Sequence, residues 1–213
     1  LYYLVIKELK DLSHIKEVKI VTKDNYLSMD VHTIRNLELF ETLRLKERTY
    51  SLIWLLDKTK TAMGSRKLKY WLQNPLKDIE TINSRYDQIE KLNNEFLIKE
   101  SIRNDLFEVY DLERLCAKVI CGSLNARDVL QIKNSLKVLP SIIDKVKSLN
   151  FNLNISDHNT LYNLLEKAIN ENPPLTLKEG FLIKEGYNEE LDELRSIRSG
   201  GKEFISTLEA SEK

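Results

Sequence analysis

The chain has 213 residues, with 33 basic and 33 acidic side chains and a formal net charge of zero. That length suits one large domain or two small ones. Hydrophobic residues make up 42% and charged residues 31%, which excludes a disordered chain and a membrane protein. Zero net charge argues against nucleic-acid binding over the whole surface, although a local basic patch is compatible with it. We therefore expect a soluble, cytosolic globular segment.

The first residues indicate a piece of a longer protein, because they carry no secretory signal and begin inside an apolar pattern. Apolar residues at helical spacing over 1–12 predict the end of a helix. Residues 18–31 then alternate apolar and polar side chains around Lys23-Asp24-Asn25. This alternation predicts two short strands joined by a turn.

From Thr33 onward, apolar residues recur every three or four positions for about 140 residues, so the fold is predicted to be mainly α. A first helix is expected to carry Leu37, Phe40 and either Leu43 or Leu45 on one face. Pro140 is expected to kink or break a long helix, and Gly122 to follow the end of another. The predicted N-caps, which divide this stretch into helices, are Ser51, Thr61, Asp78, Asp111, Asn125 and Asp157.

Alternation returns near the C-terminal end. Residues 175–183 are predicted to form a hairpin around Lys178-Glu179-Gly180. Asn188 is the expected cap of a last helix, which continues to the end of the chain and is polar enough to leave the body of the protein.

No catalytic constellation is found in the sequence. Cys116 and Cys121 lie five apart in an apolar stretch and are expected to be buried, reduced structural thiols. Gly200-Gly201-Lys202 resembles the end of a phosphate-binding loop, but Glu203 replaces the required Ser or Thr and no strand precedes it. The sequence therefore assigns no catalytic residue, no cofactor-binding residue and no metal ligand.

One basic cluster contains eight bases against two acids, Glu47 and Asp57. It has two interpretations: a solvated or subunit-facing surface, or direct contact with DNA phosphates. Trp54 and Trp71 belong to apolar stripes and are expected in the core, where Trp71→Ala would cost roughly 3–5 kcal/mol. The bases are Arg44, Lys46, Arg48, Lys58, Lys60, Arg66, Lys67 and Lys69.

The stretch from Ser51 to Leu76 resembles a signature of the MutS family of DNA mismatch repair proteins. Four further blocks resemble the family in the same order: residues 29–39, 85–89, 111–115 and 180–195. The positions that carry the resemblance most clearly are Asp57, Thr59, Met63, Gly64, Arg66, Leu68, Trp71, Leu72, Pro75, Asp111, Arg114, Gly186, Tyr187 and Asp192.

The resemblance implies three segments. Residues 1–32 would be the end of a connector helix and a short-stranded lead-in, 33–195 a helical core or lever domain, and 196–213 the start of a helix toward the clamp. The segment itself would be no enzyme and would hold no cofactor. The parent protein would be a bacterial cytosolic or nucleoid homodimer that binds mismatched double-stranded DNA, uses ATP and Mg²⁺ and cooperates with a MutL-type partner.

Within that resemblance, Leu68, Trp71 and Leu72 are expected to pack in the lever, and Gly64 to permit close approach of another helix. Gly186-Tyr187 is expected to set the turn that directs the last helix. Two alternatives remain. One is an autonomous helical DNA-binding module that uses the basic segment 44–69, and the other is a noncatalytic paralogue of the same superfamily.

Overall fold

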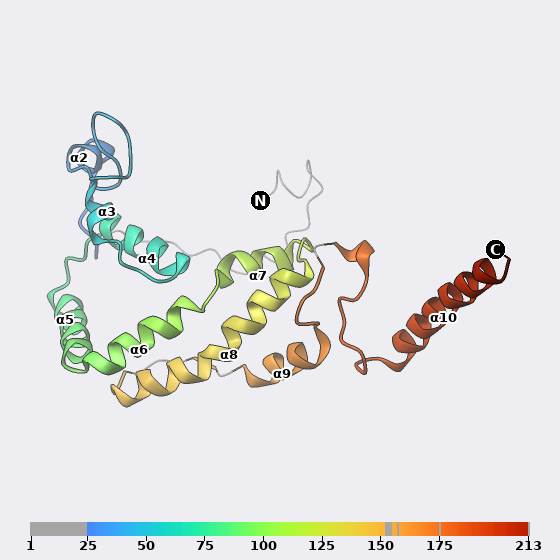
Figure 1. Ribbon diagram of the computed structural model, residues 1–213. Helices are drawn as coiled ribbons and strands as arrows, with labels where there is room; N and C mark the ends of the chain where they lie inside the picture. Colours follow the sequence, from blue (N-terminus) through green and yellow to red (C-terminus); the bar gives the residue numbers. More distant parts are fainter. Residues whose placement is uncertain (1–24, 152–154, 157, 175, 213) are drawn as a thin grey trace, which may run out of the picture. The chain divides into compact units, whose positions relative to one another are not determined.

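The computed structural model describes residues 25–151, 155–156, 158–174 and 176–212 (Figure 1). The helix predicted over 1–12 and the first predicted strand lie outside these residues. The described chain is mainly helical, as predicted, and none of its helices is long and apolar enough to cross a membrane. The helices are α2 (Val31–Asn36), α3 (Leu52–Leu56), α4 (Ala62–Gln73), α5 (Ile79–Asn94), α6 (Phe96–Phe107), α7 (Leu112–Ile120), α8 (Ala126–Ser148), α9 (Asn159–Ala168) and α10 (Glu189–Glu212).

Side-chain capping starts most of these helices where the sequence predicts it. Each confirmed cap accepts a hydrogen bond from the amide three residues further on, which satisfies one of the free N–H groups of the first turn. At α8 the Asp128 carboxylate also accepts from the Asn125 amide, which completes a capping box. Asp157 lies outside the described residues. The confirmed caps are Ser51, Thr61, Asp78, Asp111, Asn125 and Asn188.

The chain divides into two compact units that alternate along the sequence. The first comprises the described residues up to Leu55 together with Lys69–Arg85, and the second comprises Leu56–Leu68 and the described residues from Tyr86 onward. Helices α4 and α5 therefore each contribute residues to both units. The division at residues 32 and 195 stays a prediction.

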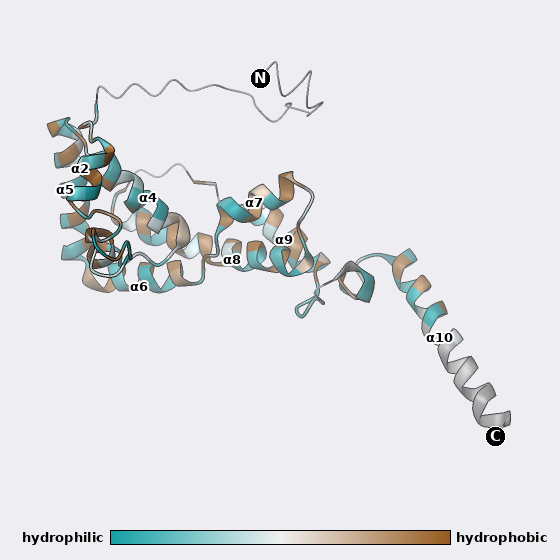
Figure 2. Ribbon diagram, turned by 90° about the horizontal axis from the view of Figure 1, so that it is seen from above, coloured by the Kyte–Doolittle hydropathy of each residue, from teal (hydrophilic) through white to brown (hydrophobic). Residues whose placement is uncertain are grey.

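Helix α8 is the centre of the second unit, where it packs against α6, α7 and α9. As Figure 2 shows, these helices carry both hydrophilic and hydrophobic residues, so that each has a side to bury. These buried faces stabilise the fold, because fully burying one aliphatic side chain contributes about 1.5–3 kcal/mol to the free energy of unfolding. The helix continues through Pro140 without a break. The buried cluster between α6 and the end of α8 consists of Ile102, Ile142, Val146 and Leu149.

Ion pairs add directional links between the same helices. Lys118 Nζ lies 2.7 Å from Asp128 Oδ1, which joins α7 to α8, and Lys133 Nζ lies 2.8 Å from Glu166 Oε2, which joins α8 to α9. Burial would raise the pKa of Asp128, but hydrogen bonds from Lys118 and the Asn125 amide outweigh it and leave that pKa lowered. The Asp128 and Lys133 side chains are both buried. Removing Lys118 would therefore leave the Asp128 charge without a partner inside the unit, and removing Glu166 would do the same to Lys133.

The start of the described chain does not form the second predicted strand. Tyr26 makes a single antiparallel bridge to Leu76, and the Leu27 amide donates to the Pro75 carbonyl at 2.7 Å. The Asp30 carboxylate then accepts from the Thr33 amide at 2.6 Å and starts helix α2, which ends the alternation. Local capping thus outweighs the strand propensity of this short segment.

The helix expected through Leu37, Phe40 and Leu43 is also wrong. Helix α2 ends at Asn36, and Glu38 adopts a left-handed backbone conformation with φ of 47°. The Glu38 carboxylate accepts from the Leu43 amide at 2.6 Å, so the chain folds into turns until α3. An apolar recurrence over so few residues does not specify a helix by itself.

The hairpin predicted over 175–183 is replaced by a different pairing. Leu177–Glu179 forms a 3₁₀ turn, and Ile183 makes its antiparallel bridge with Ile169 at the end of α9. The Lys184 amide donates to the Ala168 carbonyl at 2.8 Å. The second arm is therefore extended as expected, but its partner comes from the end of the preceding helix.

Three expectations about burial are wrong. Trp54 and Trp71 are 45% and 40% exposed, so neither is a core residue. Cys116 and Cys121 are exposed thiols. The physical reason is that each short helix buries few side chains: α3 buries only Ile53, α4 buries none and α7 buries only Leu115.

Candidate functional site

The signature segment folds into a turn held by its own side chains. Asp57 Oδ1 accepts hydrogen bonds from the Thr59 amide at 3.2 Å and from the Thr59 hydroxyl at 2.6 Å. Asp57 Oδ2 accepts from the Ser65 hydroxyl at 2.6 Å, and Thr61 Oγ1 caps α4 by accepting from the Gly64 amide at 3.0 Å. These bonds fix the first turn of α4 against the loop that precedes it. We call residues 57–66 the signature turn.

This turn leaves little space for a side chain at Gly64. A Cβ at Gly64 would lie 3.0 Å from Thr61 Oγ1 and 3.3 Å from Thr59 Cβ, closer than a side chain normally approaches. The sequence predicts a close approach of another helix at this glycine. The close neighbours are instead the side chains of the preceding loop, so the absence of a Cβ serves the cap of α4.

Arg66 joins the signature turn to the first turn of α7. Its guanidinium donates from Nη1 to Asp111 Oδ2 at 2.8 Å and from Nη2 to Asp111 Oδ1 at 2.7 Å, which makes a bidentate pair. Its Nε donates to Glu113 Oε2 at 2.8 Å, and Nη2 also contacts that oxygen. One guanidinium therefore binds two carboxylates, both at the N-terminus of one helix.

These charges shift one another's protonation equilibria. Hydrogen bonds to Asp111, and then to Glu113, raise the pKa of Arg66. The hydrogen bond from Arg66 lowers the pKa of Asp111, with a smaller contribution from the Arg114 amide that Asp111 caps. The Arg66 side chain is 45% exposed and the Glu113 side chain 67% exposed, so water and salt reach this ion pair.

A second group of signature residues sets the start of α10. Asp192 Oδ2 accepts from the Gly186 amide at 2.6 Å, and Asp192 Oδ1 pairs with Arg195 Nη1 at 3.0 Å. Arg195 Nη2 donates to the Ile183 carbonyl at 2.8 Å. Gly186 has φ of 80°, which favours glycine, and Tyr187 follows it at the turn. This geometry is consistent with the expected role of Gly186-Tyr187 in directing the last helix.

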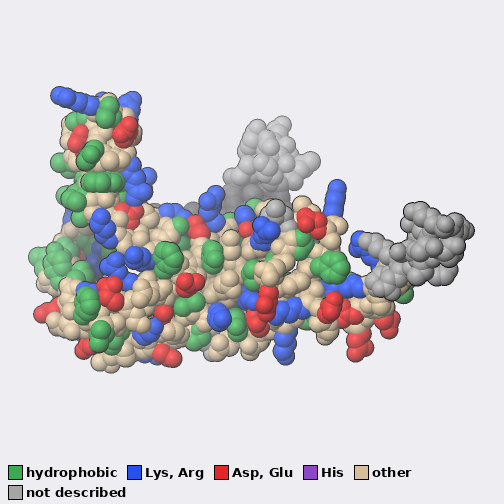
Figure 3. Space-filling model, in the orientation of Figure 1, with side chains coloured by type: hydrophobic (Ala, Val, Ile, Leu, Met, Phe, Trp, Pro, Cys, Tyr) green, Lys and Arg blue, Asp and Glu red, His purple; other side chains and the backbone are tan. Residues whose placement is uncertain are grey.

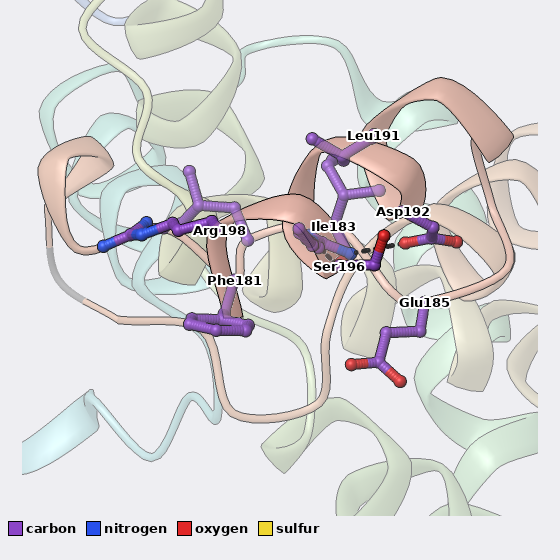
Figure 4. Close-up of a pocket in the computed structure, with 10 residues that line it drawn as sticks. Phe181, Ile183, Glu185, Leu191, Asp192, Ser196 and Arg198 are labelled. Carbon is purple, nitrogen blue, oxygen red and sulfur yellow. Dashed lines mark hydrogen bonds and ion pairs between the residues drawn. The ribbon is translucent and has the colours of Figure 1, made fainter. Parts of the chain in front are cut away.

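A hollow of about 700 Å³ lies between this turn and α10. Figure 4 shows Phe181 and Arg198 at one end of it and Glu185 and Asp192 at the other. The Arg195 guanidinium lies 5.7 Å from the centre of the Phe181 ring. The Ser196 hydroxyl, which lines the hollow, donates to the Glu193 carbonyl.

The eight predicted bases are not gathered in one unit. Arg44, Lys46, Arg48 and Lys69 belong to the first unit, whereas Lys58, Lys60, Arg66 and Lys67 belong to the second. On the face seen in Figure 3, Lys and Arg side chains are interspersed with Asp and Glu.

Among these bases, Arg66 is held by carboxylates and Lys69 Nζ lies 5.2 Å from the centre of the Phe40 ring. Direct DNA contact by the eight bases stays a prediction.

The remaining signature residues have packing or turn positions. The Arg85 guanidinium stacks 4.0 Å from the centre of the Trp71 ring, and Trp71 is 40% exposed. Met63, Leu68, Leu72 and Pro75 are half-buried. The family resemblance singled out Arg66 and Asp111 and included Glu113 in the block 111–115, but the pairing itself was not predicted, because residues 45 positions apart carry no periodic signal. Within the described residues, no group of His, Cys, Asp and Glu could hold a metal ion.

Comparisons with known proteins agree with this fold. The family described as MutS domain III matches residues 32–212. The DNA mismatch repair protein MutS of Bacillus cytotoxicus is 45% identical over 99% of this chain, and those of Bacillus cereus and Bacillus thuringiensis are 43% identical over the same share. The chain spans 24% of the length of these relatives. A matching family over most of the chain, together with this identity, places the chain in the MutS family as its domain III.

Proposed function

We propose that this chain is the lever of a MutS-type mismatch repair protein and transmits conformational change between its DNA-binding and nucleotide-binding parts. The observation that supports the proposal is the body of the second unit, in which the 23-residue helix α8 packs against three other helices. Tightly packed helices are rigid because their interiors leave no space for independent side-chain rearrangement. Such a body can carry a displacement from one end to the other.

The complete protein is proposed to be a homodimer that binds mismatched double-stranded DNA, uses ATP and Mg²⁺, works with a MutL-type partner and resides in the bacterial cytosol or nucleoid. The Gly200-Gly201 segment does not fit a phosphate-binding loop, because α10 runs through both glycines as continuous helix. Helical amides are committed to backbone carbonyls and do not form a phosphate-binding loop. We therefore assign the ATP chemistry to a domain outside this chain and no catalytic step to the chain.

The test uses the full-length protein that carries this chain. Ile142 lies in the buried cluster between α6 and α8, so Ile142→Val and Ile142→Ala remove progressively more of that packing. We expect both variants to bind a mismatched duplex with nearly unchanged affinity. ATP-triggered release of that duplex should slow in the order wild type, Val, Ala, and stopped-flow fluorescence with a labelled duplex would measure it.

Leu97→Ala is the matched control, because Leu97 lies on the packed helix α6 but is 82% exposed. This variant should release DNA at the wild-type rate. Circular dichroism would verify that each variant is folded. Wild-type release by both Ile142 variants would contradict the lever proposal.

The alternative, an autonomous DNA-binding module, makes a different prediction for the chain by itself. Phosphate contacts would give a duplex affinity that falls steeply with salt concentration. A lever should bind duplex weakly and show no preference for a mismatch. A titration with matched and mismatched duplexes at two salt concentrations separates the two functions, and Arg44→Gln with Lys46→Gln would then locate any phosphate contact.

A further inference from the structure

We propose that Arg66 is a positioning residue that acts as a reversible ionic latch, holding the signature turn on the N-terminus of α7. The inference rests on the proposed lever function, because it identifies the contact by which the signature turn is held on α7 within the lever. Its partners are Asp111 and Glu113, the two acidic residues at the start of α7. The latch lies entirely within the second unit.

The geometry makes the latch specific. The planar guanidinium meets Asp111 with two nearly equal bonds of 2.7 and 2.8 Å and reaches Glu113 with its remaining donors. A lysine has a single ammonium group and cannot reproduce this fork. The arrangement therefore fixes orientation as well as distance between the signature turn and α7.

The latch can open without unfolding its two sides. When Arg66 leaves, Asp111 still accepts from the Arg114 amide and caps α7. Both carboxylates remain favourable at a helix N-terminus because of the positive end of the helix dipole. On the other side, the signature turn keeps the bonds from Asp57 to Thr59 and Ser65. Water already reaches the contact, because the Arg66 side chain is 45% exposed and the Asp111 side chain 20% exposed.

Apolar packing between two helices would oppose opening far more strongly than an exposed ion pair does. In the second unit this packing is concentrated around α8. Among the described helices, α8 packs extensively against α6, α7 and α9, whereas α4 and α7 are not an extensively packed pair. An exposed ion pair is weakened by salt and by loss of either charge, whereas apolar packing is not. The joint at Arg66 is thus the part of the second unit that ionic conditions can release while the body stays intact.

Four substitutions isolate the latch. Arg66→Gln removes the charge, and Arg66→Lys keeps the charge but loses the fork. Asp111→Asn removes one of the two ionic partners, the bidentate one, while keeping a good N-cap for α7. Asp78→Asn is the matched control, because Asp78 caps α5 through Thr81 and makes no ion pair among the described residues.

The measurement is the distance between two spin labels in the full-length protein. One label occupies Cys116, which is exposed on α7, and the other an Ala62→Cys substitution at the exposed start of α4, with the other cysteines replaced by serine. We expect a narrow distance distribution for the wild type at low salt. It should broaden in Arg66→Gln and Asp111→Asn and at high salt, broaden partly in Arg66→Lys, and stay narrow in Asp78→Asn.

ATP-triggered release of mismatched duplex is measured on the same variants, and we expect it to slow at least fivefold in Arg66→Gln and Asp111→Asn. Unchanged distance distributions in both variants would overturn the latch, whatever the release rate. Broadened distributions with wild-type release would support the latch and contradict the lever function on which it rests. The two proposals therefore fail in different measurements.

Discussion

Helix α7 is held by two contacts of different kinds. Leu115, near its middle, is 3% exposed, and α7 packs on α8. Its N-terminal side carries Asp111 and Glu113, which meet Arg66 at an exposed, charged contact. One contact is apolar and non-directional, and the other is charged and strongly directional.

The residues of the signature turn are not core residues. Asp57, Thr59, Gly64 and Arg66 build a turn and an ion pair, while the buried cluster lies between α6 and α8, outside the signature. Packing supplies the rigidity that a lever requires. The signature supplies the orientation of the joint, for which hydrogen-bond geometry is better suited than apolar contact.

Of the substitutions considered, the one at the buried residue Leu115 should lower the free energy of unfolding most. Leu115→Ala should lower the free energy of unfolding of the chain by about 2–5 kcal/mol, because it removes buried methyl groups and leaves a cavity. Val119→Ala on the same helix should change it by less than about 0.5 kcal/mol, since Val119 is 52% exposed. Urea unfolding followed by circular dichroism would measure both. Equal losses in the two variants would show that α7 does not pack as described.

Much of this fold could be predicted because its signals are local. A cap and the amide that it satisfies lie three residues apart, so Thr61, Asp78 and Asn125 are readable from the sequence. Helical periodicity likewise predicts the long helices α6 and α8. Both kinds of signal arise within a few turns of chain, so tertiary structure has little opportunity to override them.

Features that depend on distant residues could not be predicted. Nothing in the periodicity of α4 indicates that Trp71 is stacked on Arg85 and exposed instead of buried. The pairing of Ile183 with Ile169 competes with a local hairpin and wins through contacts at the end of α9. The ion pair between Arg66 and Asp111 could likewise not be predicted, although the family resemblance includes both residues as separate positions.

The second prediction concerns the contribution of Gly64 in the signature turn to stability. Gly64→Ala should lower the free energy of unfolding by about 1 kcal/mol, because the new Cβ would meet Thr61 Oγ1 and disturb the cap of α4. Gly200→Ala in α10 should raise it by about 0.5–1 kcal/mol, because no atom lies within 4 Å of its Cβ position and alanine favours helix. Thermal unfolding of the two variants would show the opposite signs. A stabilised Gly64→Ala variant would mean that the turn tolerates a side chain.

A smaller effect concerns the exposed tryptophan of the signature. Arg85→Gln should cost about 0.5–1 kcal/mol, the usual contribution of an exposed cation–π contact. Trp71→Ala should cost less than Leu115→Ala, in contrast to the loss expected if Trp71 were buried. Adding Arg85→Gln to Trp71→Ala should then have little further effect, and a double-mutant cycle of urea midpoints would measure that coupling. Fully additive losses would exclude the stacking contact.

The smallest effect tests the charged side of α7 through pH. Because the folded pKa of Asp111 is lowered, its ionised form stabilises the chain fully above the unfolded value of about 3.9, and this stability is lost as pH falls through the lower folded pKa. The wild type should therefore lose more stability than Asp111→Asn as pH falls from about 5 toward 2, and the two should converge at the acid end.

Salt dependence separates the contribution of the Arg66–Asp111 ion pair to stability from the contribution of Asp111 as a helix cap. At about 1 M NaCl the difference between wild type and Asp111→Asn should shrink, because the screening length falls to about 3 Å. The corresponding difference for Asp78→Asn should persist, since the lowered pKa of Asp78 comes from hydrogen bonds with neutral Thr81 groups. Equal salt sensitivity at both positions would mean that Asp111 acts only as a cap, and the joint would then owe its orientation to contacts other than the Arg66 ion pair.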